Sequence, residues 1–415
     1  MYGANRNSTA CEYRFGMRIA VVGTGIAGLG AAYALSRAHE VELFERDDRP
    51  GGHTNTVLHD GLALDTGFIV HNVENYPHLT RLFGELGVRT QASDMSFSVA
   101  CARHSLEYAG RRPLGRAPAR LIREIARFLR TARGTIASAR EQTVGGYISE
   151  HGYSDQFRDH FLVPLTASLW SSGTGAAQDF PAGYALSFFD NHGLLGFRHR
   201  RWRTVVGGSR AYVSALLERA PAATLRLGLP VRAVTRDPDG VEVRTEDDVA
   251  RRFDGVVLAV HGDQALPLLA DPTDDERRVL SAFGSTANET VLHTDVRLLP
   301  RPSVRSSWNY RLADCHTVNG HPTITYYLNR LQALDTDEHY CVTLNRTDEI
   351  DESKIIRRIP YEHPLYTFES LRAQAELPSL NRGRTAFAGA WQGVGFHEDG
   401  LASGLRAAAT FGADW

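Results

Sequence analysis

The sequence predicts an α/β protein in which a parallel-sheet domain is interrupted twice by a second, α+β domain. Three observations lead to this prediction. Residues 17–52 follow the order strand, glycine turn, helix, strand, and further apolar strands are expected at 253–260 and 384–391. The stretch 271–379 contains several runs of β-branched and aromatic residues, which predict a separate sheet.

A strand, a helix and a second strand are predicted from residue 17 onward. Residues 18–22 are a short apolar run, which is typical of a buried parallel strand. Residues 26–38 are rich in Ala and Leu and contain no Pro, so they favour a helix. Residues 40–44 are a second apolar strand. This order is a βαβ unit and predicts parallel pairing of the two strands.

Glycines occupy the turn between the first strand and the helix. Gly23, Gly25 and Gly28 form the pattern G-x-G-x-x-G. The first glycine allows a tight turn, the second lets a pyrophosphate approach the backbone, and the third lets the helix pack on the strand. The helix N-terminus favours phosphate, and Glu45, after the second strand, can accept hydrogen bonds from ribose hydroxyls. This combination predicts a dinucleotide site rather than an ordinary βαβ turn.

A second pair of glycines indicates which dinucleotide is bound. Gly51 and Gly52 follow Arg49-Pro50, and the stretch 64–67 continues with Leu-Asp-Thr-Gly. This extended pattern resembles the fingerprint of FAD enzymes in the flavin amine oxidase and phytoene desaturase superfamily. In that superfamily the glycine pair lets the chain run along the FAD, whereas NAD dehydrogenases do not need it. The resemblance implies FAD as the cofactor.

Composition and charge exclude several classes of function. The chain has 415 residues, enough for two domains, and its net charge of -2 argues against a nucleic-acid-binding protein. No apolar run approaches a membrane span, and residues 1–16, predicted to be a flexible tail, lack the apolar core of a signal peptide. We therefore expect a cytoplasmic protein. Four scattered cysteines without metal-ligand spacing predict free thiols and no metal site: Cys11, Cys101, Cys315 and Cys341.

An arginine-rich amphipathic helix is predicted at residues 117–137. Its apolar positions, such as Leu121 and Phe128, fall on the face opposite Arg120 and Arg123. One interpretation is a cap helix whose apolar face packs on its own domain, which is what most amphipathic helices do. The other is peripheral contact of the arginine face with an anionic membrane or an acidic head group. We favour the first interpretation and keep the second open.

The chain closes on a second glycine turn. After the strand at 384–391 comes Gly395-Phe396-His397-Glu398-Asp399-Gly400, and a final helix is predicted from Ser403. This elbow is similar to the C-terminal FAD motif of the superfamily. The similarity implies that Gly389 and Ala390 lie near the ribityl chain and that the Leu401 N–H lies near the flavin pyrimidine oxygen. The helix end would then stabilise the anionic reduced flavin.

From Met17 onward the chain resembles a bacterial group of FAD/NAD-binding proteins of this superfamily. The stretches that carry the resemblance are 51–56, 94–98, 191–195, 308–310 and 395–400. It implies a Rossmann-like FAD-binding domain of the glutathione reductase/amine oxidase type at 17–95, 204–270 and 380–415, and a substrate or cap domain at 96–203 and 271–379. Motif and resemblance together give these cofactor-binding residues: Gly23, Gly25, Ile26, Ala27, Gly28, Glu45, Arg46, Gly51, Gly52, His53, Thr54, Gly67, Phe68, Ile69, Val231, Ala259, Gly389, Ala390, Asp399, Gly400, Leu401 and Ser403.

The resemblance implies an oxidoreductase that passes a hydride from a substrate C–H bond to flavin N5. Monoamine and polyamine oxidases keep a lysine near N5, but Lys354, the only lysine here, follows a polar stretch that reads as a loop. Members of the group are often encoded beside methyltransferases resembling cyclopropane fatty acid synthase. The leading hypothesis is therefore desaturation of an apolar or lipid-like substrate. The candidate polar groups at the flavin are His293, Tyr326, Asn329 and His397.

Two alternatives stay open. One is an FAD-dependent amine or amino-acid oxidase in which an arginine clamps the substrate carboxylate. The other, of a different class, is a binding protein that kept the fold and lost redox chemistry. The intact glycines and Glu45 argue against this second alternative.

Overall fold

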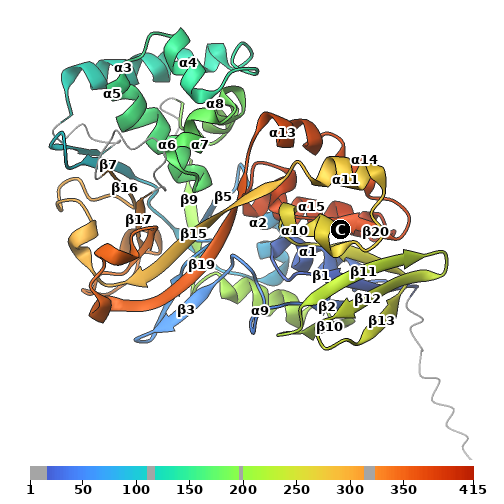
Figure 1. Ribbon diagram of the computed structural model, residues 1–415. Helices are drawn as coiled ribbons and strands as arrows, with labels where there is room; N and C mark the ends of the chain where they lie inside the picture. Colours follow the sequence, from blue (N-terminus) through green and yellow to red (C-terminus); the bar gives the residue numbers. More distant parts are fainter. Residues whose placement is uncertain (1–15, 110–116, 196–199, 313–322) are drawn as a thin grey trace, which may run out of the picture.

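The structure is a computed structural model that describes residues 16–109, 117–195, 200–312 and 323–415. The predicted N-terminal tail, except for Gly16, lies outside these residues, as do Cys11 and Cys315. Figure 1 shows that the molecule has two parts. One is a smaller sheet flanked by α1, α2 and α15, and the other is a larger sheet with a group of helices, α3 to α8, at one end.

Five parallel strands form the smaller sheet; four are those expected from the sequence, and the edge strand Ala223–Arg226 was not predicted. Their order is β10-β2-β1-β14-β20, and every neighbouring pair is parallel. Ile19 in the central strand is paired with Val41 on one side and Gly255 on the other. Segments from both ends and from the middle of the chain therefore complete one sheet. The strands are β1 (Arg18–Val22), β2 (Glu40–Phe44), β10 (Ala223–Arg226), β14 (Gly255–Leu258) and β20 (Thr385–Phe387).

Two helices, α1 (Ile26–Leu35) and α15 (His397–Ala409), cross in direct contact on one face of this sheet. A Cβ atom added to Gly404 would lie 2.1 Å from the carbonyl oxygen of Ala27. A Cβ atom added to Gly400 would lie 2.7 Å from a side-chain methyl of Ile26. The glycines therefore let the first and last helices approach closely, which brings the two glycine turns together.

The final helix begins earlier than predicted. We expected it to start at Ser403, but α15 starts at His397. The carboxylate of Asp399 accepts the backbone N–H of Phe396 at 2.9 Å and so satisfies a donor that the helix start leaves unpaired. Gly395 lies in the turn before the helix, whereas Gly400, which also favoured a turn, lies inside the helix and faces Ile26 of α1.

Seven strands form the larger sheet, in the order β19-β15-β18-β17-β16-β7-β8. The two excursions of the chain share it, because β16 pairs in parallel with β7, some 210 residues earlier (308 minus 97 is 211). The remaining pairs are antiparallel. The strands are β7 (Phe97–Cys101), β8 (Leu106–Ala109), β15 (Gly284–His293), β16 (Trp308–Leu312), β17 (Ile324–Tyr327), β18 (Cys341–Leu344) and β19 (Ile355–Leu365).

Helices of residues 117–191 form a cap at one end of the larger sheet (Figure 1). Leu121 and Phe128 of α3 are buried in its core, whereas Arg120 and Arg123 are exposed. This is the packing of a cap helix, and membrane contact of the arginine face stays a prediction. The cap consists of α3 (Ala119–Thr131), α4 (Val144–Glu150), α5 (Asp155–Phe157), the π-helix η2 (Arg158–Leu162), α6 (Val163–Trp170), α7 (Thr174–Asp179) and α8 (Ala182–Asn191).

Three smaller units complete the fold. Two three-stranded sheets have the orders β5-β9-β6 and β11-β12-β13, and β3 and β4 form a hairpin. Within the described segments, no helix has both the length and the apolar character needed to cross a membrane. The remaining elements are β3 (Thr56–His59), β4 (Leu62–Asp65), β5 (Val70–Asn72), α2 (Pro77–Leu86), β6 (Thr90–Ala92), β9 (Trp202–Val205), α9 (Arg210–Glu218), β11 (Val231–Asp237), β12 (Gly240–Thr245), β13 (Ala250–Phe253), α10 (Gly262–Leu268), α11 (Asp274–Leu280), α12 (Leu328–Leu331), α13 (Phe368–Gln374) and α14 (Leu377–Leu380).

The crossing of α1 and α15 gives a first testable prediction. We expect Gly404→Ala to lower the free energy of unfolding by about 1–3 kcal/mol, because the new methyl group would overlap the Ala27 carbonyl. Gly84→Ala in α2 is the matched control, since no atom lies within 4 Å of its added Cβ, and its stability should be unchanged or slightly higher. Urea unfolding of both variants measures the difference. Equal stabilities would contradict the close helix crossing.

Candidate cofactor and substrate site

A cavity of about 800 Å³ is lined by residues of both sheets and of the cap. The glycine turn after β1, the ends of β2 and β14, and the start of α15 line one end. Strands β16, β17 and β19, with α6 and α8, contribute the remaining walls. The volume is within the usual range for small-molecule and cofactor sites.

Backbone atoms form the surface of the cavity at its glycine end. A Cβ atom added to Gly28 would lie 1.9 Å from the Gly23 carbonyl oxygen, so this glycine is required for packing. Gly25 lines the cavity, and no atom lies within 4 Å of its added Cβ. The second glycine pair contacts the first turn, because the Gly51 N–H donates to the Thr24 carbonyl at 3.0 Å. The result is an open, backbone-lined surface of the kind that accepts a pyrophosphate.

Glu45 is held at the same end by donors of the surrounding loops. Its carboxylate accepts the backbone N–H groups of Thr24 and Asp47, each at 3.0 Å, and also the Thr24 hydroxyl. Glu45 lines the cavity and is 8% exposed. Two carboxylate oxygens offer about four acceptor positions, so with three donors in place about one remains for a further donor such as a ribose hydroxyl.

The C-terminal elbow meets the cavity through Gly389 and Ala390. The Gly389 N–H donates to the Ser403 hydroxyl at 2.8 Å, and that hydroxyl donates to the Gly400 carbonyl at 2.7 Å. The Ser403 hydroxyl of α15 therefore links the elbow at Gly389 to the helix backbone at Gly400. Leu401 is buried against Gly30 of α1 and does not line the cavity.

The predicted cofactor residues fall into two sets. One set lines the cavity, and the other supports it from behind. The supporting residues close the turns, pack the helices or anchor side chains, but do not line the cavity: Gly28, Gly51, Thr54, Asp399, Gly400, Leu401 and Ser403. Contact of either set with a cofactor stays a prediction. Those that line the cavity are Gly23, Gly25, Ile26, Ala27, Glu45, Arg46, Gly52, His53, Gly67, Phe68, Ile69, Val231, Ala259, Gly389 and Ala390.

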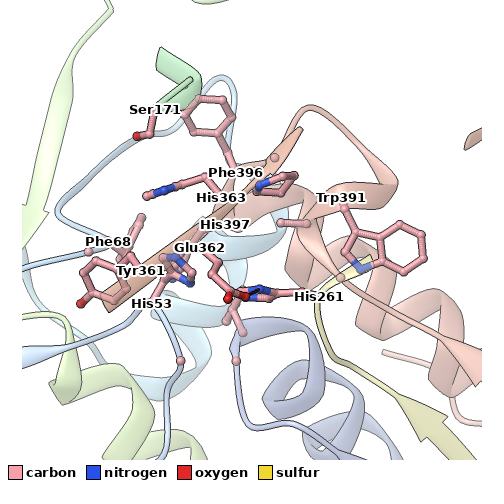
Figure 2. A pocket seen from close by; sticks show the side chains of 18 of the residues that line it. His53, Phe68, Ser171, His261, Tyr361, Glu362, His363, Trp391, Phe396 and His397 are labelled. Carbon is pink, nitrogen blue, oxygen red and sulfur yellow. Dashed lines mark hydrogen bonds and ion pairs between the residues drawn. The ribbon is translucent and has the colours of Figure 1, made fainter. Parts of the chain in front are cut away.

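Histidines and a tyrosine surround His53 in the middle of the cavity (Figure 2). The His53 ring stacks on Tyr361 with 4.8 Å between ring centroids, and the rings of His363 and His261 lie 5.3 Å and 5.7 Å away. Burial lowers the pKa of His53 well below its usual range and lowers that of His363 to about 4. Both rings are therefore uncharged at neutral pH. Among the described residues, His53 Nε2 has no hydrogen-bond partner.

His397 lies at the start of α15, against the same cavity. Its ring stacks on Phe68 at 3.9 Å, and its Nε2 hydrogen-bonds the Thr54 hydroxyl at 2.9 Å. Burial lowers the His397 pKa to about 3, so this ring is also neutral. Thr54 is thus an anchor for His397, a role that its sequence position alone does not reveal.

The structure brings only two of the four predicted polar groups to the cavity. Tyr326 and His397 line it, whereas His293 and Asn329 do not. His293 uses both ring nitrogens inside the sheet, with the Thr343 hydroxyl at 2.7 Å and the Asp295 N–H at 3.1 Å. Asn329 closes a loop, because it accepts the Tyr340 N–H at 2.9 Å and donates to the Glu338 carbonyl at 2.7 Å. His293 and Asn329 therefore lie outside the cavity at which they were expected.

Three consecutive residues of β19, Tyr361, Glu362 and His363, line the cavity and were not predicted. His261, also unpredicted, lies 3.2 Å from Glu362 through its Nδ1 (Figure 2). In the sequence, the only signal was a cluster of a phenol, a carboxylate and an imidazole at the end of a strand. Their position depends on the pairing of β19 with β15, which the sequence does not specify.

The remaining part of the cavity, here called the apolar end, is lined mainly by aromatic and aliphatic side chains from β7, β9, β16, β17, β18, α6, α8 and α12 and from loops. Ser168, Ser171 and His192 also line the cavity beside them. Tyr326 packs edge-to-face on Trp308 at 5.0 Å, and its hydroxyl hydrogen-bonds Ser171 of the cap. None of the described residues at this end is an arginine or a lysine. The apolar end consists of Met95, Phe97, Leu165, Leu169, Phe188, Leu194, Trp202, Trp308, Tyr326, Leu331, Leu344 and Phe396.

These features fit a dinucleotide of the FAD type. Gly25 and Gly52 offer backbone surface, and Glu45 a fixed carboxylate at the end of β2. The elbow at Gly389 lies on the same cavity, although it is 366 residues from Gly23 (389 minus 23). The unpaired Nε2 of His53 adds a buried polar atom that lacks a protein partner among the described residues.

Glu45 gives the second testable prediction. We expect Glu45→Ala to weaken FAD binding about 10- to 100-fold, because hydrogen bonds to a charged acceptor are worth about 1.5–3 kcal/mol. Glu40→Ala, at the exposed start of the same strand, is the control and should bind FAD normally. Calorimetric titration of each apoprotein with FAD measures the change. Equal affinities for the two variants would exclude Glu45 as a cofactor ligand.

The buried histidines predict that the protein loses stability in acid. Burial lowers the pKa of His71, His192, His293 and His363 to about 4, from an ordinary value of 6.5. The unfolded chain then binds more protons, so stability present above pH 6.5 is lost as the pH falls towards 4. Burial raises the pKa of Asp65 and Asp399 to about 6, which opposes this loss, but these carboxyls are fewer.

We therefore expect the thermal midpoint to fall between pH 6.5 and pH 4. Circular dichroism at fixed ionic strength measures it, and flavin fluorescence shows whether cofactor release coincides. A midpoint that stays level or rises as the pH falls would contradict the burial of these imidazoles.

Comparison with known proteins places this site in a family. A family profile described as flavin-containing amine oxidoreductase matches residues 26–324. A 75-residue segment is 44% identical to protoporphyrinogen oxidase 2, chloroplastic/mitochondrial, of Arabidopsis thaliana, which is 18% of this chain and 15% of that protein. A 52-residue segment is 44% identical to 4,4'-diapophytoene desaturase of Staphylococcus aureus strain Newman, or 12% and 10% of the two chains. The alignments thus span a small part of either relative.

The whole fold is similar to that of a solved structure, wild-type putrescine oxidase bound to putrescine. The TM-score is 0.70, with 96% of this chain and 99% of that chain covered at 16% sequence identity. At this identity the likeness establishes the fold alone. The profile, in contrast, covers well over half of the chain and includes the cap and much of the cavity lining, although Gly23, Gly25 and the C-terminal elbow lie outside the matched residues. The chain belongs to the family of flavin-containing amine oxidoreductases, and it is an FAD-dependent oxidoreductase.

Proposed function

We propose that this protein desaturates an apolar, lipid-like substrate. Bound FAD supplies the chemistry by accepting a hydride from a substrate C–H bond at N5, while the second hydrogen leaves the substrate as a proton. The observation that carries the proposal is the apolar end of the cavity, whose walls are mainly aromatic and aliphatic on both the sheet side and the cap side. Each methylene buried there contributes about 0.8 kcal/mol to binding.

The residues at the glycine end have proposed roles as cofactor ligands. Gly25 and Gly52 would contact the pyrophosphate through their backbone, and Glu45 would accept a ribose hydroxyl. The backbone of Val231 would lie along the adenine, and Gly389 with Ala390 along the ribityl chain. All of these residues line the cavity, which is what the proposal requires.

The charges of the cavity favour an uncharged substrate. An amino acid would need a cation for its carboxylate, and the described residues of the apolar end include no arginine or lysine. An amine would need an acceptor for its ammonium group, and none of the described residues of the apolar end is a carboxylate; of the lining carboxylates Asp263 and Glu362, which do not belong to that end, Glu362 is paired with His261 at 3.2 Å. The neutral rings of His53 and His397 add polar atoms without charge.

Tyr326 is the polar group best placed to orient such a substrate. It stands on β17 within the apolar end, and Tyr327 points elsewhere and hydrogen-bonds His339 at 2.8 Å. Burial raises the Tyr326 pKa, so the phenol stays protonated at neutral pH. It can therefore donate a hydrogen bond to a substrate oxygen but does not act as a base.

Anaerobic reduction of the bound flavin tests the proposal. We expect a panel of fatty acids, fatty acyl esters and isoprenoids to contain compounds that bleach the flavin absorbance, and amines and amino acids to leave it unchanged. Bleaching by amines or amino acids alone would support the amine or amino-acid oxidase alternative. A colourless protein that takes up no FAD would support the binding-protein alternative.

Two variants sharpen this experiment. Trp308→Ala should raise the lipid concentration for half-maximal reduction roughly tenfold or more, because it removes a large wall of the apolar end. Lys354→Ala should reduce at the normal rate, since Lys354 is exposed and lies outside the cavity. A slow Lys354→Ala variant with an unaffected Trp308→Ala variant would contradict the proposal.

The exposed arginine face of α3 supports a further proposal about where such a substrate is met. Arg120, Arg123 and Arg130 are exposed and could contact an anionic membrane surface, while the apolar face of the helix is buried in the cap. Contact of this kind is electrostatic and is weakened by salt.

A further inference from the structure

A thiol and two imidazoles converge where the β7–β8 hairpin of the larger sheet meets the cap. Their ligand atoms, one each from Cys101, His104 and His160, all lie within 4.8 Å of one another. None of the three residues lines the cavity. Spacing between cysteines gave no sign of this cluster, because two members are histidines and one of them is 56 residues away (160 minus 104).

The hairpin between β7 and β8 positions the first two groups. Cys101 is the last residue of β7 and is buried, and it pairs with Leu106 at the start of β8. The turn between them is tight, with Ser105 at φ +47°. It places His104 Nδ1 3.6 Å from Cys101 Sγ. The hairpin thus folds this C-x-x-H segment so that Cys101 Sγ and His104 Nδ1 face the same point.

His160 approaches the same point from the cap. It lies in η2, a single π-helical turn, and π-turns inside helices are frequent at functional sites. Its Nδ1–H donates to the Gln156 carbonyl at 3.1 Å, which leaves the lone pair on Nε2. The Tyr108 hydroxyl donates to the His160 carbonyl at 2.6 Å and ties this turn to β8. A backbone acceptor for the ring N–H that does not bind the metal, as Gln156 provides for His160, is typical of metal-binding histidines.

We propose that Cys101 Sγ, His104 Nδ1 and His160 Nε2 bind one Zn²⁺ ion. Thiolate and imidazole are the ligands that zinc prefers, and tetrahedral bond lengths of about 2.0–2.3 Å place neighbouring ligand atoms about 3.3–3.6 Å apart. The pair Cys101–His104 already has this separation. His104 is exposed, so its side chain can close the remaining distance and the ion can enter from solvent. Water would complete the coordination.

Two converging imidazoles distinguish this cluster from a simple thiol–histidine pair. One imidazole is enough to activate a thiolate nucleophile, and Cys101 is only 2% exposed, which leaves little access for an electrophile. A cation, in contrast, needs several ligands around one point. The ion would connect the β7–β8 hairpin to the turn that precedes α6, whose side chains Leu165 and Leu169 line the cavity. Its role would be structural, as a brace behind the substrate wall.

Cobalt is the probe for this site, because Co²⁺ occupies zinc sites and its visible d–d bands lie at longer wavelengths than the flavin absorption. The FAD-loaded, tag-free protein is titrated with Co²⁺ and then with Zn²⁺. We expect one equivalent of Co²⁺ to produce tetrahedral d–d bands and one equivalent of Zn²⁺ to abolish them. Thermal midpoints with and without Zn²⁺ provide a second readout, with a rise expected on zinc binding.

Variants assign the ligands. Cys101→Ser and His104→Ala should each weaken Co²⁺ and Zn²⁺ binding at least about tenfold, and His104→Ala is the more secure test because its side chain is exposed and its loss does not disturb the core. His59→Ala removes a partly exposed imidazole of β3 and serves as the matched control, with binding unchanged. The proposal is overturned if the protein shows no d–d bands, or if His104→Ala and Cys101→Ser bind metal as tightly as His59→Ala. Neither result depends on the identity of the substrate.

Discussion

The contact between α1 and α15 is the constraint on which the rest of the molecule depends. Gly400 and Gly404 let the two helices approach until the backbone of one meets that of the other. With the helices at this separation, the turn after β1 and the elbow after β20 line one cavity. The parallel sheet and the helix crossing together hold the two turns in place. The cofactor site of this protein thus depends on Gly400 and Gly404, which do not line the cavity.

The charge pattern of the cavity follows from burial. Charged residues such as Glu45 and Arg46 gather at the glycine end, where the loops supply hydrogen-bond donors. Further in, the imidazoles of His53, His363 and His397 are kept neutral by the cost of desolvating a cation. The cavity therefore changes from polar and charged to uncharged and apolar along its length. This gradient suits a ligand pair in which one partner is a nucleotide and the other a hydrocarbon.

The sequence predicted the parts of the fold that depend on local pattern. The βαβ unit, its three glycines and the strand before the elbow all have signatures within a few residues, and these elements were found where expected. The start of α15 was misplaced because glycines favour turns locally, whereas here they face another helix. His293 was misjudged because alternation along a strand does not show which face meets a cavity, and Asn329 because it lies in α12, where its side chain closes a loop. Tyr361 and His363 were missed because the pairing of β15 with β19 decides their place.

The pairing of distant segments also governs how the chain can be made. Strand β1 lies between β2 and β14, and the sheet is complete only when β20, which ends at residue 387, has been synthesised. In the larger sheet, β7 must wait for β16, which ends at residue 312. Ribosomes add about 5–20 residues per second, so the first βαβ unit waits tens of seconds for its partners. During that time its apolar strand edges are unprotected. The growing chain therefore exposes apolar strand edges, which favour aggregation, until the last strand of the sheet can pair.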